Sequence, residues 1–249
     1  MNKIYNGDSI ELMKELEDNT IDLTVTSPPY DNLRDYNGYK FDFEGIAREL
    51  FRVTKDGGVV VWVVADAVIN GSESGTSFEQ ALFFKKIGFN LHDTMIWSKD
   101  TFSFPDKTRY RSSFEYMFIF SKGKPSRINL IEDRKNKWSG CKVHGTSRGK
   151  DGKTFKKSNC GTITKEIGVR FNVWDLPTEK KNRSSHPAPF PESIAKDHIL
   201  SWSNEGDLVL DPMCGSGTTC KMAKLNKRNY IGIDCSVEYC SIARERLFA

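Results

Sequence analysis

Apolar and polar positions along the chain fall into two alternating patterns. Short apolar runs bounded by turn residues predict strands over residues 21–26, 59–64, 91–97, 115–121, 208–210 and 230–233. Apolar residues spaced three or four positions apart predict helices over residues 9–17, 43–53, 78–87, 191–203, 218–225 and 237–247. Because strands alternate with helices, the sequence predicts an α/β fold with a doubly wound, mostly parallel sheet.

Two local features of the pattern lead to further expectations. Lys-Asp-Gly-Gly at residues 55–58 predicts a turn before the apolar run at residues 59–64. In the last predicted helix, Arg244 and Arg246 are expected to lie on a solvated face.

Length and composition limit the possible classes of protein. A chain of 249 residues with 38% hydrophobic residues suits one large domain, or one domain with an insert. No run reaches about 18 apolar residues, and residues 1–17 lack the apolar core of a signal peptide, so we expect a cytoplasmic protein without a membrane span. The six cysteines follow no regular framework, and we expect free thiols and no metal site.

Positive charge is concentrated in one segment. Residues 122–170 contain 14 Lys or Arg residues and four acids, a balance of about +10 that leaves about −6 for the rest of the chain. Such a segment can attract a phosphate backbone. Charge alone fits a solvated, flexible loop equally well.

A glycine-containing loop follows one predicted strand and precedes a helix. Gly215-Ser216-Gly217 places small residues and backbone N–H groups where a nucleoside can lie close, and Asp234, 17 residues after Gly217, can accept both ribose hydroxyls. Cys220 stands where a dinucleotide fingerprint has its third glycine, and no P-loop lysine follows. The loop therefore indicates a nucleoside-type cofactor, and the alternative is a tight turn without a ligand.

The second informative motif is Ser27-Pro28-Pro29-Tyr30, directly after a predicted strand. An exocyclic base amine is a poor nucleophile because its lone pair is delocalised into the ring. The Ser27 hydroxyl and the Pro28 carbonyl can accept hydrogen bonds from such an amine, and the prolines preorganise the backbone. Tyr30 can stack on an extruded base. The alternative is that the prolines only end the strand and Tyr30 packs.

Two further segments combine cations with aromatic residues. Arg34 and Tyr36 follow the Pro-Pro motif, and Arg109 and Arg111 flank Tyr110 before the strand at residues 115–121. This pattern suits contacts with a DNA backbone and stacking on bases. Ordinary surface loops remain an alternative for both segments.

Together the motifs resemble one enzyme family. Thr26–Tyr30 resembles the catalytic motif of the amino-group DNA methyltransferases, which methylate cytosine N4 or adenine N6. Residues 211–219 resemble their S-adenosylmethionine loop, and residues 232–234 resemble their ribose-binding motif. Asn6–Ser9 resembles the N-terminal motif whose acid contacts the cofactor adenine, and His186–Pro191 resembles the segment before the cofactor loop. The order of motifs matches the permuted, beta-class arrangement.

This resemblance implies a Rossmann-like methyltransferase fold in three parts: a catalytic half (residues 1–121), a basic target-recognition insert (122–173) and a cofactor-binding half (174–249). It implies S-adenosylmethionine as cofactor and double-stranded DNA as partner, with the target base flipped out. The expected catalytic residues are Ser27, Pro28, Pro29 and Tyr30. The expected cofactor-binding residues are Asp8, Ser9, Asp211, Pro212, Cys214, Gly215, Ser216, Gly217, Thr218 and Asp234. The expected DNA-binding residues are Arg34, Tyr36, Arg109 and Arg111.

The resemblance also bears on the methylated atom. In this family Ser-Pro-Pro-Tyr is associated mainly with cytosine N4 and Asp-Pro-Pro-Tyr with adenine N6, so we expect N4-cytosine, with N6-adenine as the alternative. Methylation at cytosine carbon 5 is disfavoured because the chain has no Pro-Cys pair. An NAD-type oxidoreductase and a catalytically inactive DNA-binding module are alternatives from other classes. A homodimer, a restriction endonuclease partner and the target sequence stay open.

Overall fold

The computed structural model describes residues 2–29, 41–101, 107–178 and 191–248. The chain forms two compact units. We call residues 1–129 together with 172–249 the sheet unit, and residues 130–171 the ribbon unit.

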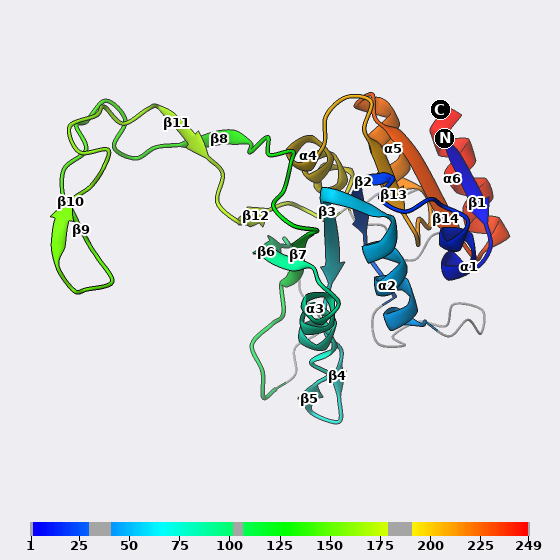
Figure 1. Cartoon of the computed structure of the whole chain (residues 1–249). Helices are drawn as coiled ribbons and strands as arrows, with labels where there is room; N and C mark the ends of the chain where they lie inside the picture. The colour runs from blue at the N-terminus through cyan, green and yellow to red at the C-terminus, as the bar shows by residue number, and fades with distance from the viewer. Residues whose placement is uncertain (1, 30–40, 102–106, 179–190, 249) are drawn as a thin grey trace. The chain divides into compact units, whose positions relative to one another are not determined.

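An eight-stranded sheet forms the centre of the sheet unit, in the order β1-β14-β13-β2-β3-β7-β6-β12 (Figure 1). Every neighbouring pair is parallel except those made by β7, which runs antiparallel to β3 and β6. The mostly parallel α/β fold predicted from the sequence is therefore confirmed. The strands are β1 (Lys3–Asn6), β2 (Ile21–Thr26), β3 (Thr54–Val64), β6 (Asn90–Ser98), β7 (Phe114–Ser121), β12 (Val173–Asp175), β13 (Leu208–Asp211) and β14 (Asn229–Asp234).

Helices cover both faces of this sheet, as the term doubly wound requires. One face packs against α1 (Ser9–Lys14), α2 (Phe43–Val53) and α3 (Thr76–Lys86). The other face packs against α4 (Glu192–Trp202), α5 (Thr218–Leu225) and α6 (Val237–Phe248). Strand β3 shows why its apolar run is continuous: Val59, Val61 and Val63 face one helix layer, and alternate residues such as Trp62 face the other.

The structure differs from the sequence prediction at a few local points. The turn predicted at residues 55–58 is wrong, because these residues belong to β3, which shifts register against β2 between Ile21 and Leu23. Backbone hydrogen bonds to Lys122 hold Gly57 and Gly58 in the sheet. Strands β1 and β12 were not predicted, since three or four residues are too few to show a period. A short hairpin, β4 (Val68–Ile69) and β5 (Ser72–Glu73), follows β3.

The ribbon unit consists of antiparallel strands. Strand β8 (Glu132–Lys135) pairs with β11 (Ile167–Val169), and β9 (Thr146–Arg148) pairs with β10 (Thr154–Lys156). Among the helices that the structure describes, none has the length and apolar character needed to cross a membrane.

Candidate active site at the carboxyl edge of the sheet

The two motifs from opposite ends of the chain lie side by side. Strand β2 pairs directly with β13, so Ser27 and the loop after Asp211 both leave the carboxyl ends of neighbouring strands. Parallel α/β sheets bind ligands at this edge. A buried hydrogen bond of 2.8 Å from Thr26 Oγ1 to Asp211 Oδ1 links the two motifs. A second bond of 3.0 Å joins Thr219 Oγ1 to the Val25 carbonyl.

The predicted catalytic motif is partly described. Strand β2 ends at Thr26, Ser27 is half-buried, and Pro28 is buried. Residues 27–29 lie outside the strand ladder, which agrees with two prolines that cannot donate to a sheet. Tyr30, Arg34 and Tyr36 lie outside the described residues.

The glycine loop has the backbone conformation that only glycine adopts easily. Gly215 and Gly217 have φ angles of +48° and +78°. A Cβ at Gly217 would lie 2.8 Å from the Cβ of Ala243 on α6, so the helix approach also requires glycine there. Cys220 packs against the backbone of Gly232, where a Cβ would lie 2.7 Å from its sulfur. Helix α5 therefore packs closely on the sheet because the glycine is on strand β14, at Gly232, and not on the helix, where Cys220 stands.

Asp234 lies at the end of β14 and faces this loop. Its Oδ2 accepts a hydrogen bond of 2.8 Å from the Gly215 N–H, and its Oδ1 accepts one of 2.8 Å from the Ser236 N–H. Burial raises the pKa of the Asp234 carboxyl, and the two N–H groups oppose that shift. The residue therefore holds the loop and presents an acceptor beside it.

The N-terminal segment folds back onto the same loop. Strand β1 pairs with β14, and the Gly7 N–H donates to the Asp234 carbonyl at 3.0 Å. The Ser9 hydroxyl donates to the Pro212 carbonyl. Asp8 caps α1, since its Oδ1 accepts from the backbone N–H groups of residues 10 and 11. The expected cofactor residues thus come together from both ends of the chain.

Asp211 is the most perturbed acid of the site. Its carboxyl is buried, and burial raises its pKa to about 7, although hydrogen bonds with Thr26, the Met213 N–H and Thr219 oppose the shift. Burial also raises the pKa of the Cys214 and Cys220 thiols well above the ordinary value. These cysteines therefore stay protonated and are unsuited to nucleophilic catalysis.

Arg246 is a site residue that the sequence prediction missed. The expectation of a solvated face is wrong for this side chain, which is 19% exposed. Its Nη1 donates to the Ser216 carbonyl and hydroxyl at 2.8 Å each, and its Nη2 donates to Glu192 Oε1 at 2.9 Å. Arg244 also donates to a backbone carbonyl, that of Ile4, at 2.9 Å. An arginine near a helix C-terminus gives no sequence signal for such a role, because it fits the helix dipole anyway.

Replacing Arg246 by alanine is expected to weaken binding of the nucleoside ligand by about 10-fold, because it removes charge-assisted hydrogen bonds that hold Ser216. Arg246→Lys should recover part of the loss. Calorimetric titration measures the Kd, with Glu245→Ala, an exposed neighbour on α6, as the control. Equal Kd values for Arg246→Ala and the control would contradict this role.

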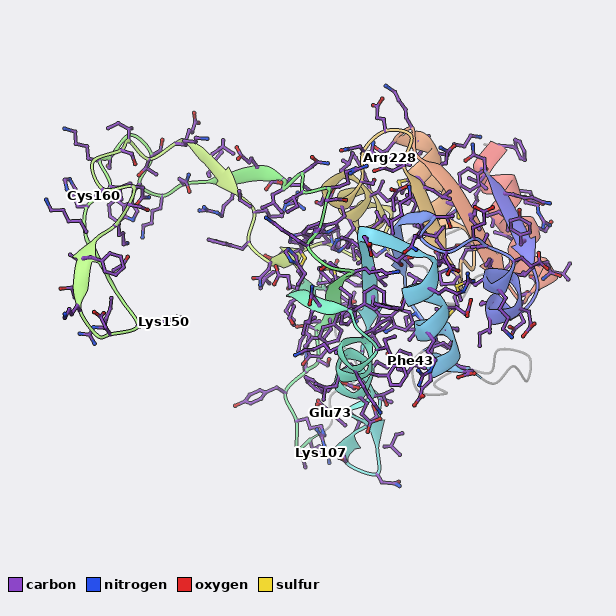
Figure 2. The ribbon with its side chains drawn as sticks, in the orientation of Figure 1. Phe43, Glu73, Lys107, Lys150, Cys160 and Arg228 are labelled. Atoms are coloured by element: carbon purple, nitrogen blue, oxygen red, sulfur yellow. The ribbon has the colours of Figure 1, made fainter. Side chains whose placement is uncertain are left out.

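The two arginines predicted to contact DNA lie in the segment before β7. Arg109 donates from Nη2 to the Gly71 carbonyl in the β4–β5 turn, and Arg111 is exposed. Figure 2 shows Glu73 of the hairpin and Lys107 of this segment at the same end of the sheet unit. The structure thus joins this segment to the hairpin after β3.

Comparison with known proteins defines the class. The family model described as DNA methylase (N6_N4_Mtase) matches residues 21–245, so the chain belongs to this family. It is a DNA methyltransferase of the amino-group type, which uses S-adenosylmethionine.

Particular relatives support this membership. The chain is 63% identical over 246 residues to the orphan methyltransferase M.BamHII of Bacillus amyloliquefaciens, a match that covers 94% of this chain and 92% of the relative. The PvuII DNA methyltransferase (cytosine-N4-specific) has a similar structure, with a TM-score of 0.73, 19% identity and coverage of 98% and 85% of the two chains. The M1.HpyAVI–SAM complex has a TM-score of 0.68 at 22% identity, with 99% of each chain covered.

Proposed function

We propose that this protein methylates the exocyclic N4 amine of cytosine in duplex DNA, after flipping the base out of the helix. The observation that supports this proposal most strongly is the direct link between the two motifs. Thr26 and Asp211 hydrogen-bond to each other, and they precede the amine-binding motif and the donor loop respectively. An acceptor amine and a methyl donor can therefore meet in one site.

The residues of the donor loop fit S-adenosylmethionine. Residues 215–217 have small side chains or none, Gly215 and Gly217 have left-handed backbone, and the Asp234 carboxyl accepts a hydrogen bond from the Gly215 N–H beside them. When bound, the group supplies an electrophilic methyl on a sulfonium, and that positive charge suits a site that contains three acids, Asp8, Asp211 and Asp234. In our proposal Asp8, Ser9, Asp234 and residues 211–218 hold the donor, and Asp234 accepts from the ribose hydroxyls.

The amine pocket is built by the Ser-Pro-Pro-Tyr motif. In our proposal the Ser27 hydroxyl and the Pro28 carbonyl accept hydrogen bonds from the target amine, which localises its lone pair and orients it for in-line attack. Pro29 fixes the backbone, and Tyr30 stacks on the extruded base. The amine loses its proton after the methyl is transferred.

The choice of cytosine over adenine depends on Ser27. In the family that this motif resembles, serine at this position is associated mainly with cytosine N4. The structurally similar PvuII enzyme is cytosine-N4-specific. Adenine N6 is the alternative, because the family model covers both amines.

DNA contacts are assigned to three regions of the chain. We propose that four residues contact DNA near the target base: Arg34, Tyr36, Arg109 and Arg111. We also propose that the basic insert, residues 122–173, recognises the target sequence; along the chain this insert lies between the catalytic half (1–121) and the cofactor half (174–249). Because M.BamHII is described as an orphan methyltransferase, we infer that this enzyme also acts without a cognate endonuclease.

Digestion of DNA to nucleosides after incubation with the protein and methyl-deuterated S-adenosylmethionine tests the proposed function. Mass spectrometry is expected to detect labelled N4-methylcytosine. Labelled N6-methyladenine would select the alternative, and labelled 5-methylcytosine or no labelled nucleoside would overturn the proposal. Sequencing of the same DNA gives the target.

Asp234→Ala is expected to raise the Kd for S-adenosylmethionine by about 10- to 100-fold, because the variant loses the carboxylate that holds the loop and accepts from the ribose. Asp234→Asn keeps one acceptor oxygen and should show a smaller increase. Equilibrium binding without DNA measures both values, and circular dichroism controls for folding. An unchanged Kd in Asp234→Ala would contradict the assigned role.

A further inference from the structure

The ribbon unit contains two separate two-stranded sheets, β8–β11 and β9–β10. Between them, an isolated bridge at Lys142 and Ile163 and backbone hydrogen bonds from Gly140 to Thr164 and from Val143 to Thr162 join the outgoing and returning chain. A hydrogen bond from the Gly149 N–H to the Lys153 carbonyl closes the turn. The chain therefore runs out along one strand and returns along the other (Figure 1).

This ribbon has no core. Every residue from 130 to 171 is described, and none of their side chains is buried. An isolated two-stranded ribbon is at best marginally stable in water. A ribbon whose two faces are both open is suited to insertion into a partner that covers them.

The chemistry of the ribbon indicates which partner it fits. Residues 130–171 contain 11 Lys or Arg residues and four acids, a net charge of +7, which leaves −3 for the sheet unit. The partner is therefore polyanionic. The major groove of B-DNA, about 12 Å wide, admits a two-stranded β-ribbon.

Register separates the two faces of the β9–β10 hairpin. Residues paired directly across an antiparallel ladder share a face, and neighbours along a strand alternate. Arg148 pairs with Thr154 and Thr146 pairs with Lys156, so these four side chains lie on one face, which we call the polar face. Ser147 and Phe155 pair on the opposite face.

We propose that the polar face of the hairpin enters the major groove and reads base edges, with Arg148 donating two hydrogen bonds to N7 and O6 of a guanine. This proposal rests on the proposed function, since it identifies the element that selects the target. Thr146 and Thr154 supply shorter hydroxyl contacts to neighbouring bases. Lys150 lies at the turn of the hairpin (Figure 2), and the Lys153 carbonyl accepts the hydrogen bond that closes it. In our proposal both lysines contact phosphates and set the position of the hairpin.

The test uses the target sequence found by sequencing DNA that the wild-type protein has methylated. Duplexes then carry 7-deazaguanine at single guanines, which removes the N7 acceptor in the major groove, or hypoxanthine, which removes only the minor-groove amine. For the wild type, one 7-deazaguanine position is expected to lower kcat/KM by about 10- to 100-fold, and the hypoxanthine duplex is expected to react normally.

Arg148→Ala is expected to show at least this loss on the unmodified duplex, because it removes the bonds to both N7 and O6, and no further loss with 7-deazaguanine. Its methylated sites should tolerate other bases at that position. Arg148→Lys keeps the charge and a donor for guanine O6 or N7, so it should retain part of the rate and of the preference for guanine, which guards against a general folding defect. Ser147→Ala, on the opposite face, is the matched control and should behave as wild type.

Three outcomes overturn the proposal while leaving methyl transfer intact: Arg148→Ala keeps wild-type sites and rates, the losses from Arg148→Ala and from 7-deazaguanine multiply, or no single 7-deazaguanine substitution lowers the wild-type kcat/KM. A wild-type protein that methylates no DNA overturns both this proposal and the proposed function.

Lys153→Ala provides a second readout, of the phosphate contact at the turn. It should weaken binding equally for all sequences and reduce the slope of log K against log salt by about one.

Discussion

Ser27→Ala is expected to lower kcat by about 100- to 1,000-fold and to leave the Kd for S-adenosylmethionine within about 2-fold of wild type. Loss of one preorganised polar partner at a reacting group typically has an effect of this size. The donor loop keeps its own contacts in this variant, because Asp211 still accepts a hydrogen bond from the Thr26 hydroxyl and Asp234 still accepts one from the Gly215 N–H. Single-turnover methylation of a saturating duplex measures the chemical step, and calorimetry measures donor binding.

Ser27→Thr is the matched control for this prediction, because it keeps a hydroxyl on the same carbon and should retain more activity than Ser27→Ala. A parallel loss of donor binding and turnover in Ser27→Ala would show that the motif supports the fold of the site instead of acting on the amine. The division of roles between the two motifs would then be wrong.

Asp211→Asn is expected to remove a pH dependence of stability that amounts to as much as about 4 kcal/mol in the wild type. The folded-state pKa of about 7 lies above the ordinary value of 3.8, so the fold favours the protonated acid. Its contribution is fully present below pH 3.8 and is lost as the pH rises through about 7. Asparagine cannot titrate, yet it can accept from the Thr26 hydroxyl and the Met213 N–H as the acid does.

Urea unfolding of both proteins at several pH values, without donor or DNA, checks this prediction. The free energy of unfolding of Asp211→Asn, minus that of the wild type, should increase from acid to neutral pH. The pKa of Asp234 is raised in the same direction, and this group is present in both proteins. The difference therefore reports the titration of Asp211 together with its coulombic coupling to Asp234. Parallel curves for the two proteins would contradict the raised pKa.

Much of the sheet unit was predictable from hydrophobic periodicity. The helix predicted at residues 43–53 and the strand predicted at residues 21–26 have the bounds seen in the structure, because both bury apolar residues at regular spacing. Periodicity failed where backbone pairing decides the structure. Residues 55–58 have turn chemistry, yet hydrogen bonds to Lys122 keep them in β3. The edge strand β1 is specified by its pairing with β14, which leaves little local pattern.

The candidate site was predictable for a different reason. Its residues are concentrated in short motifs whose spacing reflects strand ends and glycine conformations, and Gly215 and Gly217 do have positive φ angles. What the motifs could not show is how the site is supported. The Thr26–Asp211 bond joins residues 185 positions apart, and the Arg246 contacts depend on how α6 packs against the loop.

The pairing in the ribbon unit could not be predicted from its composition. Alternation of polar and apolar residues identifies a strand only where one face is buried, and both faces of this ribbon are exposed. Charge therefore indicated a polyanionic partner, whereas the assignment of Arg148 and Thr154 to one face required the register of β9 and β10.

The central claim is that the Ser27 motif and the donor loop form one site in which a flipped base meets the methyl donor. A crystal structure of the protein with S-adenosylhomocysteine and its target duplex tests this claim most directly. We predict an extruded cytosine whose N4 lies within hydrogen-bonding distance of Ser27 Oγ, with the ligand sulfur close to that nitrogen and the ribose against Asp234. A target base that stays stacked in the duplex, or a ligand bound away from residues 211–218, would contradict the account.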